Sequence, residues 1–302
     1  MTNRIGSPFS DRGTITDPKR FFGRAKEKQQ IFNQLASPKP QSVAIIGERR
    51  IGRSSLLKNV EQSFTEVLPG HERYDFGYLS LDSDTIRTPN QFYGAVAKEL
   101  FGTAPEELAP GRFDDLLTSY DESGATRYVL LLDEFNVLQR RKEAFDDDFY
   151  DGLRSRINAQ SPKLAIVLAS HVPLEEVAVQ NDFSSTFFGI FYTVDLGPFS
   201  VDEARAAVLR ECEHQLEAPD FRQVQQWVEE VYHPLKLNVG ANLVWMDSPD
   251  PDYEALKAEF EKQVAHIFGD KVKEKRQEKL DQAEADEAKD AGLISRIKSW
   301  WR

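Results

Sequence analysis

The chain has 302 residues, of which 40% are hydrophobic and 29% charged, as expected for a folded globular protein with one large α/β domain and an appendage, or two modest domains. Its net charge of -12 argues against broad nucleic-acid binding, because phosphate contacts require a basic face. The single cysteine, Cys212, excludes a disulfide framework and predicts a cytoplasmic location.

The N-terminal segment has no basic stretch followed by an apolar run, so we expect no secretory signal. No run approaches the roughly 18 apolar residues that a membrane-spanning helix needs. The five histidines are scattered, with no spacing typical of a zinc site.

Strand-like and helical segments alternate between residues 42 and 196. Strands are expected at 42–47, 74–82, 127–135, 163–170 and 191–196, and helices at 54–64, 89–101 and from 146 onward. Continuous apolar strands separated by helices predict an α/β fold with a mainly parallel sheet covered on both faces. In such a fold, ligands bind beyond the carboxyl ends of the strands.

The pattern becomes helical after 196–200, which we interpret as a hinge. Ser200 and Glu203 predict a capping box that opens the first of several helices. We therefore expect an N-terminal segment at 1–40, an α/β core at 41–198, a small helical domain at 199–269, and a charged helix with an amphipathic tail at 270–302.

The segment after the first strand resembles the phosphate-binding loop G-x-x-x-x-G-K-[ST], in the strand–loop–helix context that such a loop requires. Two glycines would let successive backbone N–H groups point at phosphates, and the N-terminus of the next helix would add positive potential. The alternative is an ordinary glycine turn. The nucleotide-binding residues expected here are Gly47, Glu48, Arg49, Arg50, Ile51, Gly52, Arg53, Ser54 and Ser55.

Arg53 occupies the position at which the motif has lysine. Arginine can bind phosphate, but its planar, forked guanidinium does so in a different geometry from a lysine ammonium. We assign Arg53 a role in binding the phosphates and in catalysis. We expect its different geometry to affect the hydrolysis of ATP more than the binding of ATP. The alternative is that it replaces the lysine without consequence.

The strand at 127–135 ends in two acids. Asp133, together with the Ser54 hydroxyl, would hold Mg²⁺, and Glu134 would act as the general base on the attacking water. The alternative is a pair of solvated acids after a buried strand. Ser170, at the end of the 163–170 strand, would contact the γ-phosphate or the water. His171 is the alternative to it, and either residue could simply begin a loop.

These segments together resemble the AAA-like and STAND-type P-loop ATPases, the group with the archaeal-type ATPases and Orc/Cdc6-like domains. The resemblance rests, in chain order, on GERRIGRSSLL, LLLDEF, LASHV and SSTFFGIFYTVDLGPFSVDEA. It implies a three-layer P-loop fold with a parallel sheet in the order 5-1-4-3-2 and a small helical lid, binding ATP and Mg²⁺.

The same resemblance adds residues on either side of the core. An F-x-G-R box would place Phe22, Gly23 and Arg24 near the adenine and phosphates, although Phe21 and Phe22 could equally be a hydrophobic staple for the next helix. His233 and Pro234 match a G-H-P box that senses nucleotide, with Tyr232 in place of its glycine. They could instead cap and start a helix.

Two features depart from the family pattern. The 184–191 stretch carries no arginine that could act on a neighbouring subunit, which leaves Arg140, Arg141 and Arg154 as candidate arginine fingers. No winged-helix domain follows the lid, so DNA binding by that route is not expected.

The tail at 291–302 has apolar residues on one helical face with basic residues among them. It would pack on its own protein, bind a partner, or contact a membrane surface, in decreasing order of preference.

The sequence thus predicts an ATP-binding, slowly hydrolysing molecular switch or assembly factor that exchanges ATP and ADP and acts on a protein partner or by self-association. The alternatives are a non-hydrolysing signalling scaffold and, less favoured, a nucleic-acid-associated ATPase.

Overall fold

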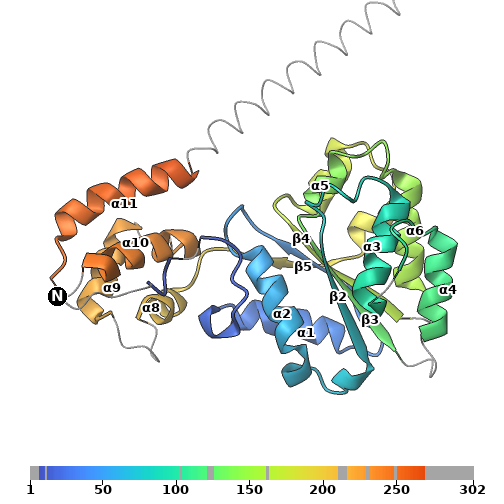
Figure 1. Cartoon of the computed structure of the whole chain (residues 1–302), viewed down its shortest axis with the longest axis horizontal. Helices are drawn as coiled ribbons and strands as arrows, with labels where there is room; N and C mark the ends of the chain where they lie inside the picture. The colour runs from blue at the N-terminus through green and yellow to red at the C-terminus, as the bar shows by residue number, and fades with distance from the viewer. Residues whose placement is uncertain are drawn as a thin grey trace, which may run out of the picture.

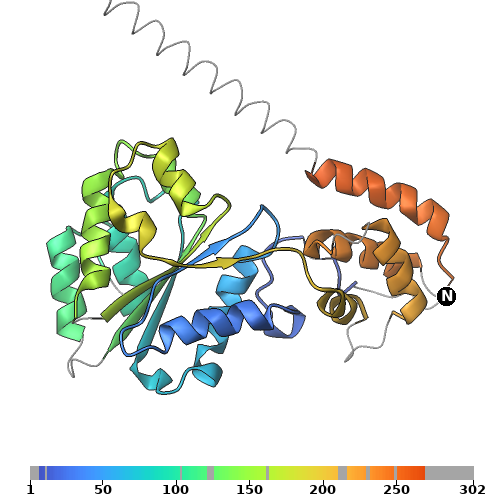
Figure 2. The same ribbon diagram turned by 180° about the vertical axis from the view of Figure 1, so that it is seen from behind.

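The computed structural model describes residues 7–10, 12–102, 104–120, 126–160, 163–209, 216–228, 232–247 and 250–268. An α/β unit holds the strands, and a group of helices from the C-terminal part of the chain lies beside it (Figures 1 and 2). Cys212, the charged segment from 270 and the predicted tail helix at 291–302 lie outside the described residues.

Five strands form one sheet. They are β1 (Val43–Ile46), β2 (Tyr74–Ser80), β3 (Arg127–Asp133), β4 (Lys163–Ser170) and β5 (Tyr192–Asp195). All neighbours pair in parallel, in the order β2-β3-β4-β1-β5. The predicted order 5-1-4-3-2 is therefore confirmed, and the carboxyl ends of β1, β3 and β4 meet at one edge.

Helices cover both faces of the sheet. On one face lie α1 (Ala25–Leu35) and α2 (Arg53–Val67); on the other lie α3 (Pro89–Phe101), α4 (Pro110–Tyr120), α5 (Asn136–Gln139), α6 (Asp147–Asn158) and α7 (Leu174–Gln180). Side chains of a strand point alternately to the two faces. Accordingly, Val43 and Ile45 join the core under α1 and α2, whereas Ala44 and Ile46 join the opposite core. Burial on both faces explains why the inner strands β1, β3 and β4 are largely apolar runs, whereas the edge strands β2 and β5 are partly exposed.

The helical group has its own core. It consists of α8 (Val201–Leu209), α9 (Ala218–Trp227), α10 (Pro234–Asp247) and α11 (Tyr253–Phe268). The expected capping box opens α8, since the Ser200 backbone N–H donates to Glu203 Oε2 at 2.9 Å and the Glu203 N–H donates to Ser200 Oγ at 3.3 Å. Phe9 is buried in this core and packs edge-on against Trp245, at 6.4 Å between ring centroids. The N-terminal segment thus reaches the helical group.

The predicted elements recur with shifted ends, and three short 3₁₀ turns occur at Pro18–Arg20, His71–Arg73 and Thr186–Gly189. The sequence pattern predicted no element at 110–120, where α4 buries Phe113 and Leu117 in the core on the face of the sheet that α3 also covers. Within the described parts of the chain, no helix is long and apolar enough to cross a membrane.

Candidate functional site

The loop between β1 and α2 needs both of its glycines, for different reasons. A Cβ on Gly47 would lie 2.6 Å from the carbonyl oxygen of Leu196, just after β5, so the loop start has no room for a side chain. Gly52 has open space around it but a φ of 104°, a backbone conformation that side chains disfavour. The loop then enters α2 at Arg53, as the phosphate-loop interpretation requires.

Arg53 is buried, with 6% of its side chain exposed. Its Nη1 donates to the carbonyl oxygen of Gly47, and its Nη2 lies 3.9 Å from Glu134 Oε1. Burial lowers the pKa of the Arg53 guanidinium, and the carboxylates of Glu134 and Asp133 oppose that shift. The guanidinium therefore joins the first glycine of the loop to the expected general base.

The Asp133 carboxylate accepts three hydrogen bonds from described residues. Ser54 Oγ donates to Oδ1 at 3.1 Å, the backbone N–H of Glu134 donates to Oδ1 at 2.9 Å, and Tyr78 Oη donates to Oδ2 at 2.8 Å. Hydroxyl and carboxylate oxygens are the ligands that Mg²⁺ prefers, usually completed by phosphate oxygens and water. In the part of the chain that the structure describes, no three His, Cys, Asp or Glu side chains form a metal cluster. The donors at Ser54 and Asp133 therefore fit a magnesium ion held jointly with nucleotide phosphates.

A cavity lies over the loop, between the N-terminal segment and the helical group. It is lined by Arg12, Gly13, Thr14, Ile15, Arg20, Phe21, Phe22, Arg24, Arg50, Ile51, Gly52, Arg53, Ser54, Ser55, Glu134, Phe199, Ala207, Pro234, Leu235 and Asn238. Its lining contains five arginines and one acid, so the cavity has a strong excess of positive charge. Such a lining suits a ligand with several negative charges.

The FFGR segment joins three parts of the molecule. Arg24 Nη2 donates to the carbonyl oxygen of Ile51 in the loop at 3.2 Å, and its guanidinium lies 4.5 Å from the Phe199 ring centroid. The backbone N–H of Arg24 donates to Glu203 Oε1 at 2.7 Å, on the first helix of the helical group. A Cβ on Gly23 would lie 2.9 Å from the same carboxylate oxygen. Phe22 lines the cavity, whereas Gly23 does not and lies instead against the side chains of Glu203 and Phe199.

The loop also contacts the helical group directly. His233 Nε2 lies 3.7 Å from Glu48 Oε1, and Arg50 Nη1 donates to the carbonyl oxygen of Ile267 at 2.8 Å, in the last turn of α11. His233 Nδ1 accepts the backbone N–H of Leu235 at 3.2 Å, so His233 also caps α10. Pro234 starts α10 and lines the cavity.

Ser170 and His171 lie at the end of β4 but differ in orientation. Ser170 is fully buried, and its hydroxyl donates to the carbonyl oxygen of Val172 at 2.5 Å, so it does not face the cavity. Burial, with the nearby cations Arg49, Arg53 and Arg140, lowers the pKa of His171 to about 4. His171 is therefore a neutral imidazole at physiological pH, surrounded by positive charge.

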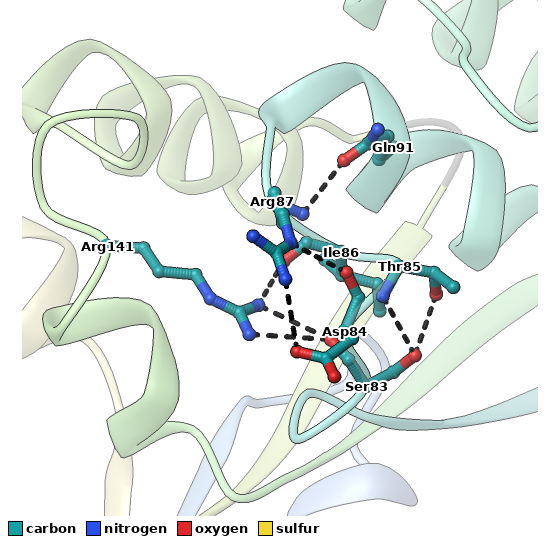
Figure 3. A network of polar contacts seen from close by, with 7 residues as sticks. All are labelled: Ser83, Asp84, Thr85, Ile86, Arg87, Gln91 and Arg141. Carbon is teal, nitrogen blue, oxygen red and sulfur yellow. Dashed lines mark hydrogen bonds and ion pairs between the residues drawn. The ribbon is translucent and has the colours of Figure 1, made fainter.

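The three candidate arginine fingers have different settings. Arg141 donates to the carbonyl oxygens of Ser83 and Ile86 and so holds the loop between β2 and α3 (Figure 3). Arg154 pairs with Asp151 of its own helix at 3.6 Å. Arg140 is exposed and lies near the cations around His171. Of the three, Arg140 is exposed, whereas Arg141 and Arg154 are half-buried.

The structure thus brings nine of the predicted residues together around or beneath one cavity: Phe22, Arg24, Arg50, Ile51, Gly52, Arg53, Ser54, Ser55 and Glu134, with Pro234 on the far wall and Asp133 behind Ser54. Gly47, Glu48, Arg49, Gly23, His233 and Ser170 do not line it. The sequence pattern did not predict a role for residues 12–15, which we call the strap. The Ile15 N–H of the strap donates to Ser55 Oγ at 2.9 Å. The pattern likewise predicted no role for Tyr78. Neither carries a local motif.

Several solved structures are similar to this fold. A Walker-type ATPase of Pyrococcus abyssi superposes with a TM-score of 0.65 at 17% identity, over 90% of this chain and 80% of that one. The Aeropyrum pernix ORC2 protein, in ADPNP and ADP complexes, gives 0.58 at 13% identity over 84% and 70%. Domain III of the Thermotoga maritima replication initiation protein DnaA gives 0.53 at 12% over 83% and 99%. No family model and no curated protein matches the sequence. The fold is the P-loop α/β fold that these solved structures share, which confirms the fold that the sequence resemblance implied.

Proposed function

We propose that this protein binds ATP and Mg²⁺ between the loop at 47–55 and the helices α8–α11, hydrolyses the ATP slowly, and acts as a nucleotide-dependent switch or assembly factor. The observation that carries the proposal is the hydrogen bond from Ser54 to Asp133 at 3.1 Å, with Glu134 and Arg53 on the wall of the same cavity. A hydroxyl from the phosphate loop and a carboxylate from a neighbouring strand end supply the protein side of a magnesium–nucleotide site.

Each residue has a role in this proposal. Backbone N–H groups of the loop and the Arg53 guanidinium bind the phosphates, and Ser54 and Asp133 hold the ion. When bound between Ser54 and Asp133, a magnesium ion would supply charge neutralisation to the phosphates. Glu134, half exposed at the cavity wall, accepts a proton from the attacking water. His171, neutral and facing the cations, donates or accepts a hydrogen bond without adding charge.

The proposed switch depends on contacts between the loop and the helical group. Glu48 faces His233 at 3.7 Å and Arg50 holds the last turn of α11, so both partners of the loop belong to the lid. A nucleotide shifts an equilibrium only if it interacts differently with the two states. Arg50 provides such a difference, because it lines the cavity and a phosphate would compete with the Ile267 carbonyl for its guanidinium.

The runner-up is a non-hydrolysing nucleotide-binding scaffold. It is supported by the 3.9 Å approach of Arg53 to Glu134, since an ion pair occupies the carboxylate that would activate water. In that case, ATP would bind without turnover, and the protein would signal through occupancy alone.

The proposal includes a protein partner or a second copy of the chain, on which the moving helices would act. Several solved proteins of this fold are described in complexes with nucleotide or DNA. For this chain we propose ATP and ADP as ligands. DNA stays the less favoured partner because of the net charge of -12.

The steady-state rate of phosphate release from Mg-ATP distinguishes the hydrolysing switch from the non-hydrolysing scaffold. We expect slow turnover by the wild type and a loss of roughly 100-fold or more in Glu134→Gln, in line with the usual contribution of a general base. Asp195→Asn, at an exposed position of β5 that does not line the cavity, is the matched control and should retain the wild-type rate. Saturable ATP binding with no turnover by the wild type would favour the scaffold.

A further inference from the structure

Tyr78 lies on β2, the strand that pairs with β3 and so neighbours the strand that ends in the two acids. In the register of this pair, Tyr78 is opposite Leu131 and Ser80 is opposite Asp133. From there, Tyr78 Oη reaches Asp133 Oδ2 and donates a hydrogen bond of 2.8 Å. No part of the phosphate-loop or acid-strand motifs includes this residue.

The bond complements the other two bonds to the same carboxylate. Ser54 and the Glu134 N–H both donate to Oδ1, whereas Tyr78 is the side chain that donates to Oδ2. Asp133 is 5% exposed, so among the described residues its orientation is set by these donors rather than by solvent. Because different donors bond the two oxygens, they fix the plane of the Asp133 carboxylate.

Tyr78 is itself held in place. The Lys58 ammonium lies 3.2 Å from the centroid of its ring, and Lys58 pairs with Glu61 at 2.9 Å. A cation over an aromatic face is an attractive contact.

From this arrangement we propose that Tyr78 is a positioning residue that orients Asp133 toward magnesium. The inference rests on the proposed function. A Ser54 hydroxyl can offer a lone pair to a metal while its proton still bonds Asp133 Oδ1, so Ser54 leaves Oδ2 to the bond from Tyr78. The bond from Tyr78 is independent of Ser54 and keeps Oδ1 directed to the side of Ser54.

The test is the affinity for a fluorescent ATP analogue, measured with excess EDTA and with excess Mg²⁺, for the wild type and Tyr78→Phe. Phenylalanine keeps the ring under Lys58 and removes only the hydroxyl. We expect the affinity in EDTA to change less than about twofold and the gain that Mg²⁺ brings to fall roughly tenfold, because partners of metal ligands typically contribute 10- to 100-fold to metal affinity.

Tyr74→Phe is the matched control, because Tyr74 lies on the same strand and its hydroxyl donates to the Leu35 carbonyl oxygen away from the site. It should keep the wild-type gain. Thermal melting in EDTA checks that both variants are folded. A full magnesium gain in folded Tyr78→Phe would overturn the inference while leaving the proposed function standing. Absence of ATP binding by the wild type would instead overturn the proposed function, and the role of Tyr78 with it.

Discussion

Arg53 makes contacts that a lysine could not make together. Its forked guanidinium donates to the Gly47 carbonyl through one nitrogen and approaches Glu134 through the other. A lysine ammonium is a single compact charge on a flexible stem. The effect of Arg53 on ATP turnover therefore depends on the shape of the guanidinium as well as on its charge.

Replacing Arg53 by lysine tests this difference. We expect Arg53→Lys to bind ATP with an affinity within a few-fold of the wild type and to hydrolyse it roughly tenfold faster, because Glu134 loses its guanidinium partner and is freer to act as a base. Phosphate release and calorimetric titration give the two numbers. Arg112→Lys makes the same chemical change at an exposed position of α4 and should leave the rate unchanged. A rate no higher in Arg53→Lys would show that the ion pair does not restrain Glu134.

At the residue level, the sequence predicted those positions that belong to a local motif. Arg53, Ser54 and Glu134 follow a strand or a glycine turn directly, so their placement follows from the chain itself. Tyr78 meets Asp133 across 55 residues, and Ile15 meets Ser55 across 40. Contacts of this kind depend on which strands become neighbours and where the N-terminal segment crosses, and no local pattern encodes them. Ser170 was placed correctly at a strand end, but its hydroxyl turns to Val172.

Among the helices of the helical group, α11 accepts hydrogen bonds from the loop and from the N-terminal segment. Arg50 donates to the Ile267 carbonyl, and Arg12 Nη2 donates to Gln263 Oε1 at 2.6 Å. Residues 263 and 267 are one turn apart on the same helical face. The last four carbonyls of a helix lack partners within it, so an arginine that binds one of them stabilises the final turn.

Removing the arginine should loosen that turn. In Arg50→Ala we expect the amides of 264–268 to exchange with deuterium roughly tenfold faster, since a hydrogen bond from a charged donor contributes about 1.5–3 kcal/mol. Peptide-resolved hydrogen exchange without nucleotide measures this. Lys262→Ala, which removes only an exposed pair with Glu259 on the same helix, should have little effect. Unchanged exchange in Arg50→Ala would mean that packing, and not Arg50, holds the end of α11.

The elements that the sequence predicted best are those buried on both faces. β3 and β4 are strands of seven and eight residues, with five and six consecutive apolar residues inside them, and their prediction needed no tertiary information. α4 was missed because only Phe113 and Leu117 face the sheet in an otherwise polar segment. The loop between β2 and α3 is held by Arg141 from a distant segment, and the sequence offered Arg141 as a finger instead (Figure 3).

At the scale of the whole molecule, the described residues form three hydrophobic cores, two on the faces of the sheet and one within the helical group, which Phe9 of the N-terminal segment joins. The core under α1 and α2 and the core of the helical group both reach the lining of the cavity. The sequence predicted the parallel sheet and the following helices, but not that the N-terminal segment would cross the cavity. A ligand in that cavity would touch the loop, the strap and the lid together, so its binding is the claim on which the switch depends.

Calorimetric titration of the full chain with Mg-ATP, followed in parallel by light scattering, tests that claim most directly. We predict saturable binding of one ATP per chain, with a dissociation constant between about 1 μM and 1 mM, and binding that is strongly weakened in folded Arg53→Ala. A change in scattering on saturation would reveal assembly. No heat of binding and no competition by ADP up to millimolar nucleotide, with the wild type folded, would contradict the account.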